Sequence, residues 1–253
     1  MNGLKGSKIN KLLKVWPAGT VAISRWLQSQ GIYPQLVQRY QKSSWVDRIG
    51  DGAFIRSGDK VGWEGALFAV QEQLELPVHV GGKTALQMLG FGHFLPLGEK
   101  LPVFLFGAPG KKLPLWFETF RSGINLRYLM ADLFSEKERL GLTKKGVGAF
   151  EITLSSPERA IMELLYLVPQ EESFEEASLL MEGLNTLRPK LVQTFLEKCR
   201  SIKVKRLFLY LAEKHNLPWV KKLDIARVNL GKGKRSLVKG GHFDQKYQIS
   251  VPK

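Results

Sequence analysis

Cysteine and long apolar segments are scarce in this sequence of 253 residues. A single cysteine, Cys199, excludes an internal disulfide and a zinc site built from cysteines, and it is typical of a reducing, cytoplasmic compartment. The longest stretch without Asp, Glu, Lys or Arg covers residues 84–98 and is interrupted by Gly and Pro. Because a membrane-spanning helix needs about 20 apolar residues, we expect no membrane span. Lysines at positions 5, 8, 11 and 14 argue against the apolar core of a secretory signal.

Patterns that carry catalysis are also missing. The four histidines lie far apart, without the H-E-x-x-H spacing of a metal site, and no G-x-S-x-G sequence is present. Residues 80–84 (Val-Gly-Gly-Lys-Thr) resemble a phosphate loop, but Pro77 stands where that motif requires glycine. We therefore expect no enzyme, no catalytic residue, no metal and no cofactor. One enzyme alternative stays open, a nucleotide-dependent transferase with Lys83 and Thr84 at an anion site on a helix N-terminus.

Charge is unevenly distributed along the chain. The net charge is +7 over residues 1–60, −5 over residues 61–182 and +13 over residues 183–253, which gives +15 in total. Two basic ends around an acidic middle favour a polyanionic partner such as nucleic acid. The alternative is that the basic residues only keep the surface soluble.

Three short helices are predicted near the start of the chain. Residues 9–16 place apolar side chains at helical spacing, and Pro17 ends this pattern. Thr20 is expected to cap a second helix that ends near Gly31. Pro34 suits the first position of a third helix, because its φ angle is already helical and its missing N–H needs no partner there. The buried side of the third helix is expected to consist of Leu36, Val37 and Tyr40.

A β-hairpin is predicted directly after the third helix, with strands at residues 45–49 and 53–56 around a Gly-Asp-Gly turn. Three short helices followed by a hairpin are typical of a winged helix-turn-helix. We assign this domain to residues 1–90, with two further helices at residues 64–74 and 83–89.

The remaining residues, 91–253, alternate between strand and helix patterns. Strands are predicted at residues 103–106, 126–130, 150–154, 225–230 and 247–251. Ser156 is expected to cap a helix, and three further apolar stripes at helical spacing follow it, at residues 177–184, 192–199 and 204–211. Cys199 lies on one stripe and is expected in the core, not as a nucleophile. The fold class is therefore α+β, a winged helix-turn-helix domain followed by a mixed α/β domain.

The exposed side of the third helix is the leading candidate for a functional surface. An α-helix fits the major groove of B-DNA, where Gln and Arg side chains bond base edges. The residues expected to read bases are Gln35, Gln38 and Arg39. The residues expected to contact phosphates are Lys42, Ser43, Ser44, Arg48 and Arg56. The alternative is an ordinary helical domain with a solvated face.

A second basic region lies near the C-terminus. Residues 231–235, Gly-Lys-Gly-Lys-Arg, form a flexible cationic segment that suits phosphate or an acidic protein surface. The residues expected on this surface are Lys203, Lys205, Arg206, Lys232, Lys234 and Arg235. The alternatives are a solvated turn, or an RNA-binding module that uses the whole basic region.

Five segments form a pattern when they are taken in order: residues 45–56, 78–86, 154–160, 204–207 and 230–235. Together they resemble the AbiEi antitoxins over nearly the whole chain. The resemblance implies a type IV toxin–antitoxin component whose winged helix binds inverted repeats at its own promoter and represses transcription. Its C-terminal domain is implied to counteract an AbiEii nucleotidyltransferase toxin, with or without a stable complex. The family acts in phage resistance by abortive infection.

For this chain the resemblance implies two partners. The first is double-stranded promoter DNA, contacted by the third helix and the hairpin. The second is an AbiEii-like nucleotidyltransferase toxin, and the basic segments at residues 203–206 and 232–235 are the part of the antitoxin domain implied to counteract it. We expect a monomer that binds DNA cooperatively.

Overall fold

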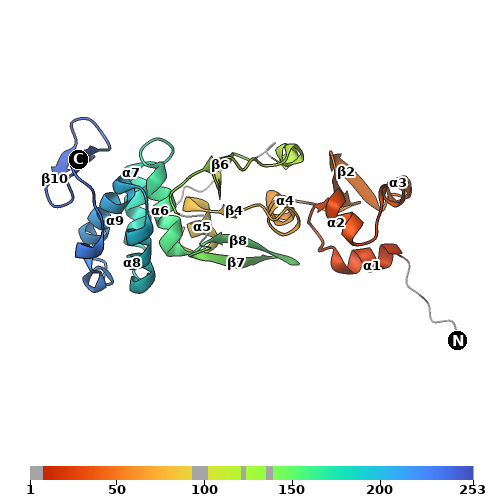
Figure 1. Cartoon of the computed structure of the whole chain (residues 1–253), viewed down its shortest axis with the longest axis horizontal. Helices are drawn as coiled ribbons and strands as arrows, with labels where there is room; N and C mark the ends of the chain where they lie inside the picture. Colours follow the sequence, from red (N-terminus) through yellow and green to blue (C-terminus); the bar gives the residue numbers. More distant parts are fainter. Residues whose placement is uncertain (1–7, 93–101, 121–123, 135–138, 253) are drawn as a thin grey trace. The chain divides into compact units, whose positions relative to one another are not determined.

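The computed structural model describes residues 8–92, 102–120, 124–134 and 139–252 (Figure 1). The chain divides into two compact units that alternate along the sequence. Unit 1 consists of Met1–Val78, Gly110–Leu126 and Lys144–Thr153, and unit 2 of His79–Pro109, Arg127–Thr143 and Leu154–Lys253. Both contain helices and strands, so the protein is of mixed α/β class. The expected domain division at residue 90 stays a prediction.

Unit 1 begins with three short helices and a hairpin. In chain order these elements are α1 (Lys8–Val15), β1 (Ala22–Ile23), α2 (Ser24–Ser29), α3 (Pro34–Lys42), β2 (Val46–Gly50) and β3 (Ala53–Arg56). The strands form an antiparallel sheet in the order β1-β3-β2. The helices and the hairpin share one apolar core, which includes Leu12, Trp16, Leu27, Ile32, Val37, Tyr40, Val46 and Phe54. The predicted first helix, third helix and hairpin are confirmed, and Pro34 occupies the first turn of α3.

The second helix begins later than expected, at Ser24. The Thr20 hydroxyl does not cap it but donates to the Pro17 carbonyl oxygen (2.7 Å), and Ile23 takes the N-cap position without a side-chain hydrogen bond. The apolar residues before Ser24 form β1 instead, where pairing with β3 satisfies their backbone groups. Past the helix end, Gly31 has a φ of +76°, which glycine adopts without strain.

The helix predicted at residues 64–74 is confirmed in position, but it changes from α-helical to π-helical geometry part-way along its length. It starts as α4 (Trp63–Phe68) and continues as a π-helical turn, η1 (Ala69–Gln73). The Gln73 side-chain amide accepts from the Ile23 N–H (2.9 Å) and donates to the Val21 carbonyl oxygen (2.9 Å). An amide side chain thereby satisfies one backbone group of β1 and one of the residue before it.

A five-stranded sheet has the strand order β6-β5-β4-β8-β7. Its strands are β4 (Val78–Val80), β5 (Val103–Gly107), β6 (Leu126–Met130), β7 (Leu142–Val147) and β8 (Phe150–Ser155). β4 and β8 run parallel, with Val80 opposite Leu154. The predicted strands β5, β6 and β8 are confirmed. β7 was not predicted, because its sequence Leu-Thr-Lys-Lys-Gly-Val lacks the apolar alternation of a strand, although lysines suit a strand at a sheet edge.

The longer helices of unit 2 are α5 (Gly82–Met88), α6 (Pro157–Leu167), α7 (Phe174–Glu182), α8 (Pro189–Lys198) and α9 (Ile202–Lys214). The predicted apolar stripes are buried on α6 to α9, which confirms these helices. Cys199 is buried as expected, and burial raises the pKa of its thiol to about 11. Ser156 takes the N-cap position of α6, but its hydroxyl makes no cap hydrogen bond.

The C-terminal part of unit 2 holds short elements: η3 (Val220–Lys222), η4 (Ile225–Arg227), β9 (Arg235–Ser236), β10 (His242–Asp244) and β11 (Ile249–Val251). The three strands form a sheet in the order β10-β11-β9. The strand predicted at residues 225–230 is wrong. Its Leu230 carbonyl oxygen accepts from the Arg206 side chain (2.8 Å) instead of joining a strand ladder. The strand predicted at residues 247–251 is reduced to β11.

Candidate nucleic-acid interface

α3 has a buried side and an exposed side. Val37 and Tyr40 face the core of unit 1, with 7% and 8% of their surface exposed. The residues expected to read bases lie on other faces and are exposed: Gln35, Gln38 and Arg39. Lys42 is exposed in the last turn, and α3 contains no acidic residue. The exposed side therefore offers amides and cations, the groups that bond base edges and phosphates.

The polar side chains of α3 are not engaged inside the protein. Among the residues that the structure describes, no ion pair or side-chain hydrogen bond involves Gln35, Gln38, Arg39 or Lys42. Ser43 and Ser44 follow at the end of α3, both exposed. Ser44 has a φ of +52°, which turns the chain sharply from the helix into the hairpin. The expected base and phosphate contacts of this helix thus form one accessible stretch.

Arg48 is exposed on the hairpin but is held by its own turn. Its Nε donates to the Gly50 carbonyl oxygen (3.1 Å), and its guanidinium pairs with Asp51. Both side chains are exposed, and an exposed ion pair contributes only about 0–1 kcal/mol. A phosphate can therefore replace Asp51 at small cost. A cleft of about 150 Å³ between α2, α3 and the hairpin is lined by Ser24, Gln28, Ile32, Pro34, Val37, Gln38, Gln41, Arg48 and Phe54.

Arg56 does not lie on this surface as expected. Its side chain is half-buried, and Nη2 donates to the Leu13 carbonyl oxygen (2.7 Å) in the last turn of α1. The guanidinium also lies over the Trp16 ring, 5.9 Å from its centre. A cation at this place satisfies a carbonyl that the helix end leaves unpaired. Arg56 therefore makes contacts inside unit 1, and its expected phosphate contact stays a prediction.

The sequence interpretation missed a basic face on α1. Lys8, Lys11 and Lys14 are exposed, while Ile9 and Leu12 of the same helix are buried. The signal was present in the spacing, because lysines three positions apart on an amphipathic helix gather on its polar side. These lysines add positive charge to unit 1 that the predicted set did not include.

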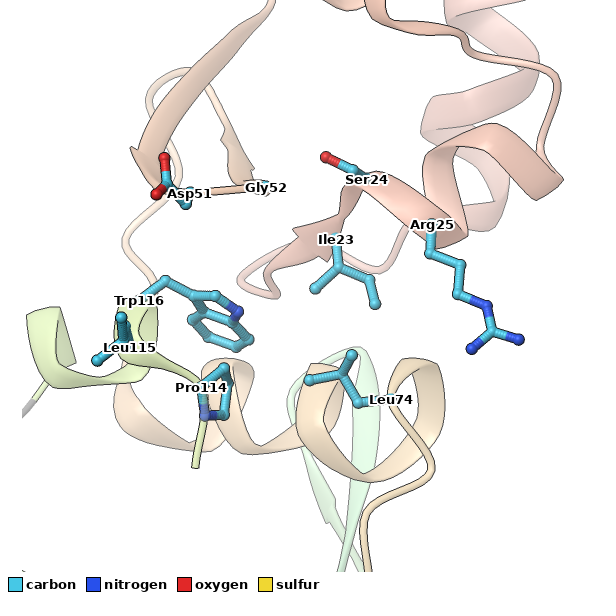
Figure 2. Close-up of a pocket in the computed structure, with 9 residues that line it drawn as sticks. All are labelled: Ile23, Ser24, Arg25, Asp51, Gly52, Leu74, Pro114, Leu115 and Trp116. Carbon is cyan, nitrogen blue, oxygen red and sulfur yellow. The ribbon is translucent and has the colours of Figure 1, made fainter. Parts of the chain in front are cut away.

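The second cavity of unit 1 was also missed (Figure 2). It has a volume of about 350 Å³ and is lined by Ile23, Ser24, Arg25, Asp51, Gly52, Leu74, Pro114, Leu115 and Trp116. In Figure 2 the Trp116 indole, Ile23 and Leu74 form apolar walls, and Arg25 extends at one edge. Trp116 belongs to η2 (Leu115–Phe120). It approaches the hairpin closely, because a Cβ added at Gly50 would lie 2.7 Å from the Cβ of Trp116. No local sequence pattern reveals a cavity built from such distant segments.

The basic surface expected near the C-terminus is divided in the structure. Lys205 and Arg206 are buried, with 3% and 2% of their surface exposed, so their expected surface role is wrong. Lys203 is half-buried, and its ammonium donates to the carbonyl oxygens of Tyr166 (2.7 Å) and Val168 (2.6 Å). The physical reason is that eight of the thirteen residues of α9 are buried, so neighbours cover more of this helix than its apolar stripe indicates.

Arg206 is surrounded by backbone carbonyl oxygens. Its guanidinium donates to the carbonyl oxygens of Leu230 (2.8 Å), Gly231 (3.2 Å), Gly233 (2.6 Å) and Gln248 (2.9 Å). The other three residues of the predicted surface are exposed on the segment that Arg206 holds: Lys232, Lys234 and Arg235. Arg206, one buried residue of the predicted surface, thus supports three exposed ones from beneath.

The transferase site considered at Lys83 and Thr84 is not formed. Both residues are buried, each with 5% of its surface exposed. The Lys83 ammonium pairs with carboxylates of Glu172 (3.3 Å) and Glu176 (2.8 Å). Burial, together with the charge of Glu176, raises the pKa of Glu172 to about 7 although Lys83 opposes the shift. The Lys83 ammonium is therefore already paired with Glu172 and Glu176 and does not offer a free charge to a nucleotide phosphate.

Glu163 of α6 is the centre of a second buried polar cluster in unit 2. Its carboxylate accepts from Ser155 Oγ (2.7 Å) and Arg159 Nε (2.8 Å) and bonds His79 Nε2 (2.8 Å). Burial alone would raise the pKa of Glu163, but the charges and hydrogen bonds of His79 and Arg159 lower it to about 2. Glu163, His79 and Ser155 are all buried, and a Cβ at Gly81 would lie 2.3 Å from the Glu163 carboxylate, so the cluster offers no exposed group to a ligand. We therefore assign Glu163 to the interior structure of unit 2.

Two further properties concern the described ranges only. Within them, no group of three or more His, Cys, Asp and Glu residues is arranged to hold a metal ion. No helix in the same ranges is both long and apolar enough to cross a membrane.

Comparison with solved structures supports the fold. The chain is similar to the crystal structure of the RV2827C protein from Mycobacterium tuberculosis, with a TM-score of 0.58 over 95% of this chain and 88% of that chain. The two sequences are 11% identical, so the similarity shows a shared fold alone. No curated protein matches the sequence.

Two family models together match nearly the whole sequence. Residues 5–97 match the N-terminal domain of the AbiEi antitoxin transcriptional regulators. Residues 100–252 match the model described as transcriptional regulator, AbiEi antitoxin, type IV toxin–antitoxin system. The chain therefore belongs to the AbiEi antitoxins, a family of transcriptional regulators from type IV toxin–antitoxin systems.

Proposed function

We propose that this antitoxin binds inverted-repeat DNA at its own promoter through a winged helix-turn-helix in residues 1–90 and represses transcription there. Three short helices, α1 to α3, precede an antiparallel hairpin, β2 and β3, that packs on them in one core. This order of elements supports the proposal, because in helix-turn-helix proteins a recognition helix enters the major groove. Cooperative binding of monomers to the two half-sites stays a prediction.

One observation carries the proposal. The exposed side of α3 presents two glutamines, an arginine and a lysine that have no partner among the described residues. Exposed polar groups without an internal partner can bind a base edge without breaking a hydrogen bond inside the protein, because they give up only their bonds to water. By contrast, the Arg56 guanidinium is half-buried and already donates to the Leu13 carbonyl oxygen, so we leave it out of the proposed base and phosphate contacts.

Distinct roles follow for the residues of this surface. Gln35, Gln38 and Arg39 reach base edges, where amides pair with adenine and guanidinium with guanine. Lys42, Ser43 and Ser44 at the end of α3 contact phosphates and fix the register. Arg48 exchanges its exposed partner Asp51 for a phosphate.

The test is binding of the full chain to the DNA upstream of its own gene and to a shuffled duplex of equal length. The triple variant Gln35→Ala, Gln38→Ala, Arg39→Ala is expected to bind both duplexes equally and weakly. Lys190→Ala, an exposed lysine of α8, serves as the control and should leave the preference unchanged. Full promoter preference in the triple variant would contradict the proposal.

We further propose that residues 91–253 counteract a cognate nucleotidyltransferase toxin. Membership in the type IV antitoxins supports this role. When the toxin is co-expressed from an unrelated promoter, both the wild-type chain and the triple α3 variant should restore growth. Loss of protection in the folded triple variant would mean that neutralisation depends on the DNA-reading surface, which contradicts this division of roles.

A further inference from the structure

The cavity in Figure 2 is a second candidate site in unit 1, and none of its lining residues belongs to α3. Its volume of about 350 Å³ lies at the lower end of the range of about 300–1,000 Å³ that small-molecule pockets occupy. Five of its nine lining residues are apolar, and the others include one cation, Arg25, and one carboxylate, Asp51. Apolar walls with a few polar groups are typical of a ligand site.

The walls of this cavity are joined to one another by contacts inside unit 1. The Gln73 side chain accepts from the Ile23 N–H (2.9 Å), which joins the end of η1 to β1. The Ser24 N–H donates to the Gly52 carbonyl oxygen (2.8 Å), which joins the first residue of α2 to the hairpin turn. On the third side, Trp116 packs against β2. Because the walls are held together before a ligand arrives, binding needs little ordering of the protein.

The Trp116 indole supplies a hydrogen-bond donor to the cavity. Only 7% of the surface of Trp116 is exposed. In Figure 2 the ring nitrogen lies on the side of the indole that faces Ile23 and Leu74. Within the part of the chain that the structure describes, no group accepts from this N–H. Since a buried indole N–H usually has a hydrogen-bond partner, an acceptor group on a ligand fits at this wall.

The Arg25 guanidinium supplies a positive charge at the edge of the same cavity. Its side chain is exposed and has no ion-pair partner among the described residues. In Figure 2, Ile23 and Leu74 lie between Arg25 and the Trp116 indole. Asp51, which also lines the cavity, pairs with Arg48 of its own hairpin, so its negative charge is already compensated. An anionic group on a ligand therefore has a cation at one end of the cavity, and a neutral acceptor has the indole N–H at the other.

We propose that the cavity in Figure 2 binds a small aromatic carboxylate that carries a hydroxyl group at the far end of its ring system. The ring covers Ile23 and Leu74, the carboxylate pairs with the two-pronged guanidinium of Arg25, and the hydroxyl oxygen accepts from the Trp116 indole. A phosphate ester fits less well, because one exposed cation does not compensate a double negative charge beside apolar walls. The site does not depend on the proposed reading of promoter DNA, since it uses no residue of α3.

The first experiment tests the carboxylate with the full chain and isothermal titration calorimetry. The probe is 6-hydroxy-2-naphthoate, and its neutral amide is the comparison compound. Arg25→Gln is expected to weaken binding of the carboxylate about fivefold and binding of the amide less than twofold. Lys60→Gln removes an exposed cation of unit 1 outside the cavity and should change neither affinity. Equal losses in both variants, or no binding of the carboxylate at about 1 mM, would overturn the proposal.

The second experiment tests the indole donor by comparing 6-hydroxy-2-naphthoate with 2-naphthoate, which lacks the hydroxyl group. The wild-type chain is expected to bind the hydroxylated compound about threefold more tightly. Trp116→Phe keeps an aromatic wall without the N–H and should bind both compounds equally. Trp45→Phe, at an exposed tryptophan outside the cavity, should keep the preference. A preference that persists in Trp116→Phe would overturn the assignment of the indole donor.

The third experiment uses a substitution that does not endanger the fold. Leu115 lines the cavity with 88% of its surface exposed, so Leu115→Asp changes little inside unit 1. The added negative charge should weaken binding of 6-hydroxy-2-naphthoate about threefold and leave binding of its amide unchanged. Equal effects on both compounds would contradict the proposed charge recognition. If sedimentation shows that the wild-type chain is a dimer and that Leu115→Asp is a monomer, a second copy fills the cavity and the small-molecule assignment is wrong.

Discussion

α3 and α9 both carry Lys and Arg on amphipathic helices, yet the structure uses these cations in opposite ways. On α3 the charged side is solvated, and Arg39 and Lys42 have no partner among the described residues. On α9 the corresponding side is covered by the C-terminal segment, and Arg206 is saturated by carbonyl oxygens. The comparison teaches that a helical stripe identifies the apolar side of a helix but not what covers the polar side.

The largest expected effect concerns the covered cation. Arg206→Leu leaves four carbonyl oxygens without their donor, which should lower the free energy of unfolding by about 3 kcal/mol. Arg39→Leu on the exposed side should change it by less than about 0.5 kcal/mol. Urea unfolding of both variants measures the difference. Similar stabilities would mean that the two helices use their arginines alike, contrary to the structure.

The next effect concerns the exposed arginine of α3, where we expect a change in DNA affinity instead of a change in stability. Arg39→Ala should weaken binding to promoter DNA by about 1–3 kcal/mol if the guanidinium makes a bidentate base contact. Binding to shuffled DNA should change much less, because no specific base contact is lost there. Titrations of both duplexes decide the matter. A uniform loss on promoter and shuffled DNA would remove Arg39 from the base-reading set.

A third cation, Lys83 of α5, is buried like Arg206 but pairs with carboxyl groups instead of backbone carbonyl oxygens. Its partner Glu172 has a pKa raised to about 7, above the value of about 4.3 in an unfolded chain. The folded state therefore holds an extra proton between these values, so stability is lost as pH rises from about 4.3 to 7. Glu172→Gln should remove that loss and make the chain about 1–2 kcal/mol more stable than wild type at pH 8.

Thermal unfolding at pH 5 and pH 8 provides the measurement for Glu172→Gln. At pH 5 the variant and the wild type should have similar melting temperatures, because Gln resembles the protonated acid. Glu151→Gln, an exposed glutamate of β8, serves as the control. A variant destabilised at both pH values would show that the charged carboxylate is required by Lys83.

The same contrast explains how much the sequence could predict. Pro34 and the spacing of Val37 and Tyr40 locate α3 and also its exposed side, because both properties are local. The burial of Arg206 depends on residues 230–248, which return to α9 only in the folded chain. The cavity in Figure 2 likewise joins residues 23 and 116, and no periodicity relates such distant positions. Local signals therefore gave α3, whereas the buried cations and the cavity required tertiary structure.

The smallest expected effect separates two exposed residues within α3. Lys42→Ala should weaken promoter and shuffled DNA alike, by less than about 1 kcal/mol, and should reduce the salt slope by about 0.9, because one phosphate contact releases about one counterion. Arg39→Ala, in contrast, should change the ratio of the two affinities. Titrations at several salt concentrations measure both quantities. If Lys42→Ala altered the ratio and left the slope unchanged, Lys42 would have to be moved from the phosphate contacts to the base contacts, and the order of roles along α3 would be reversed.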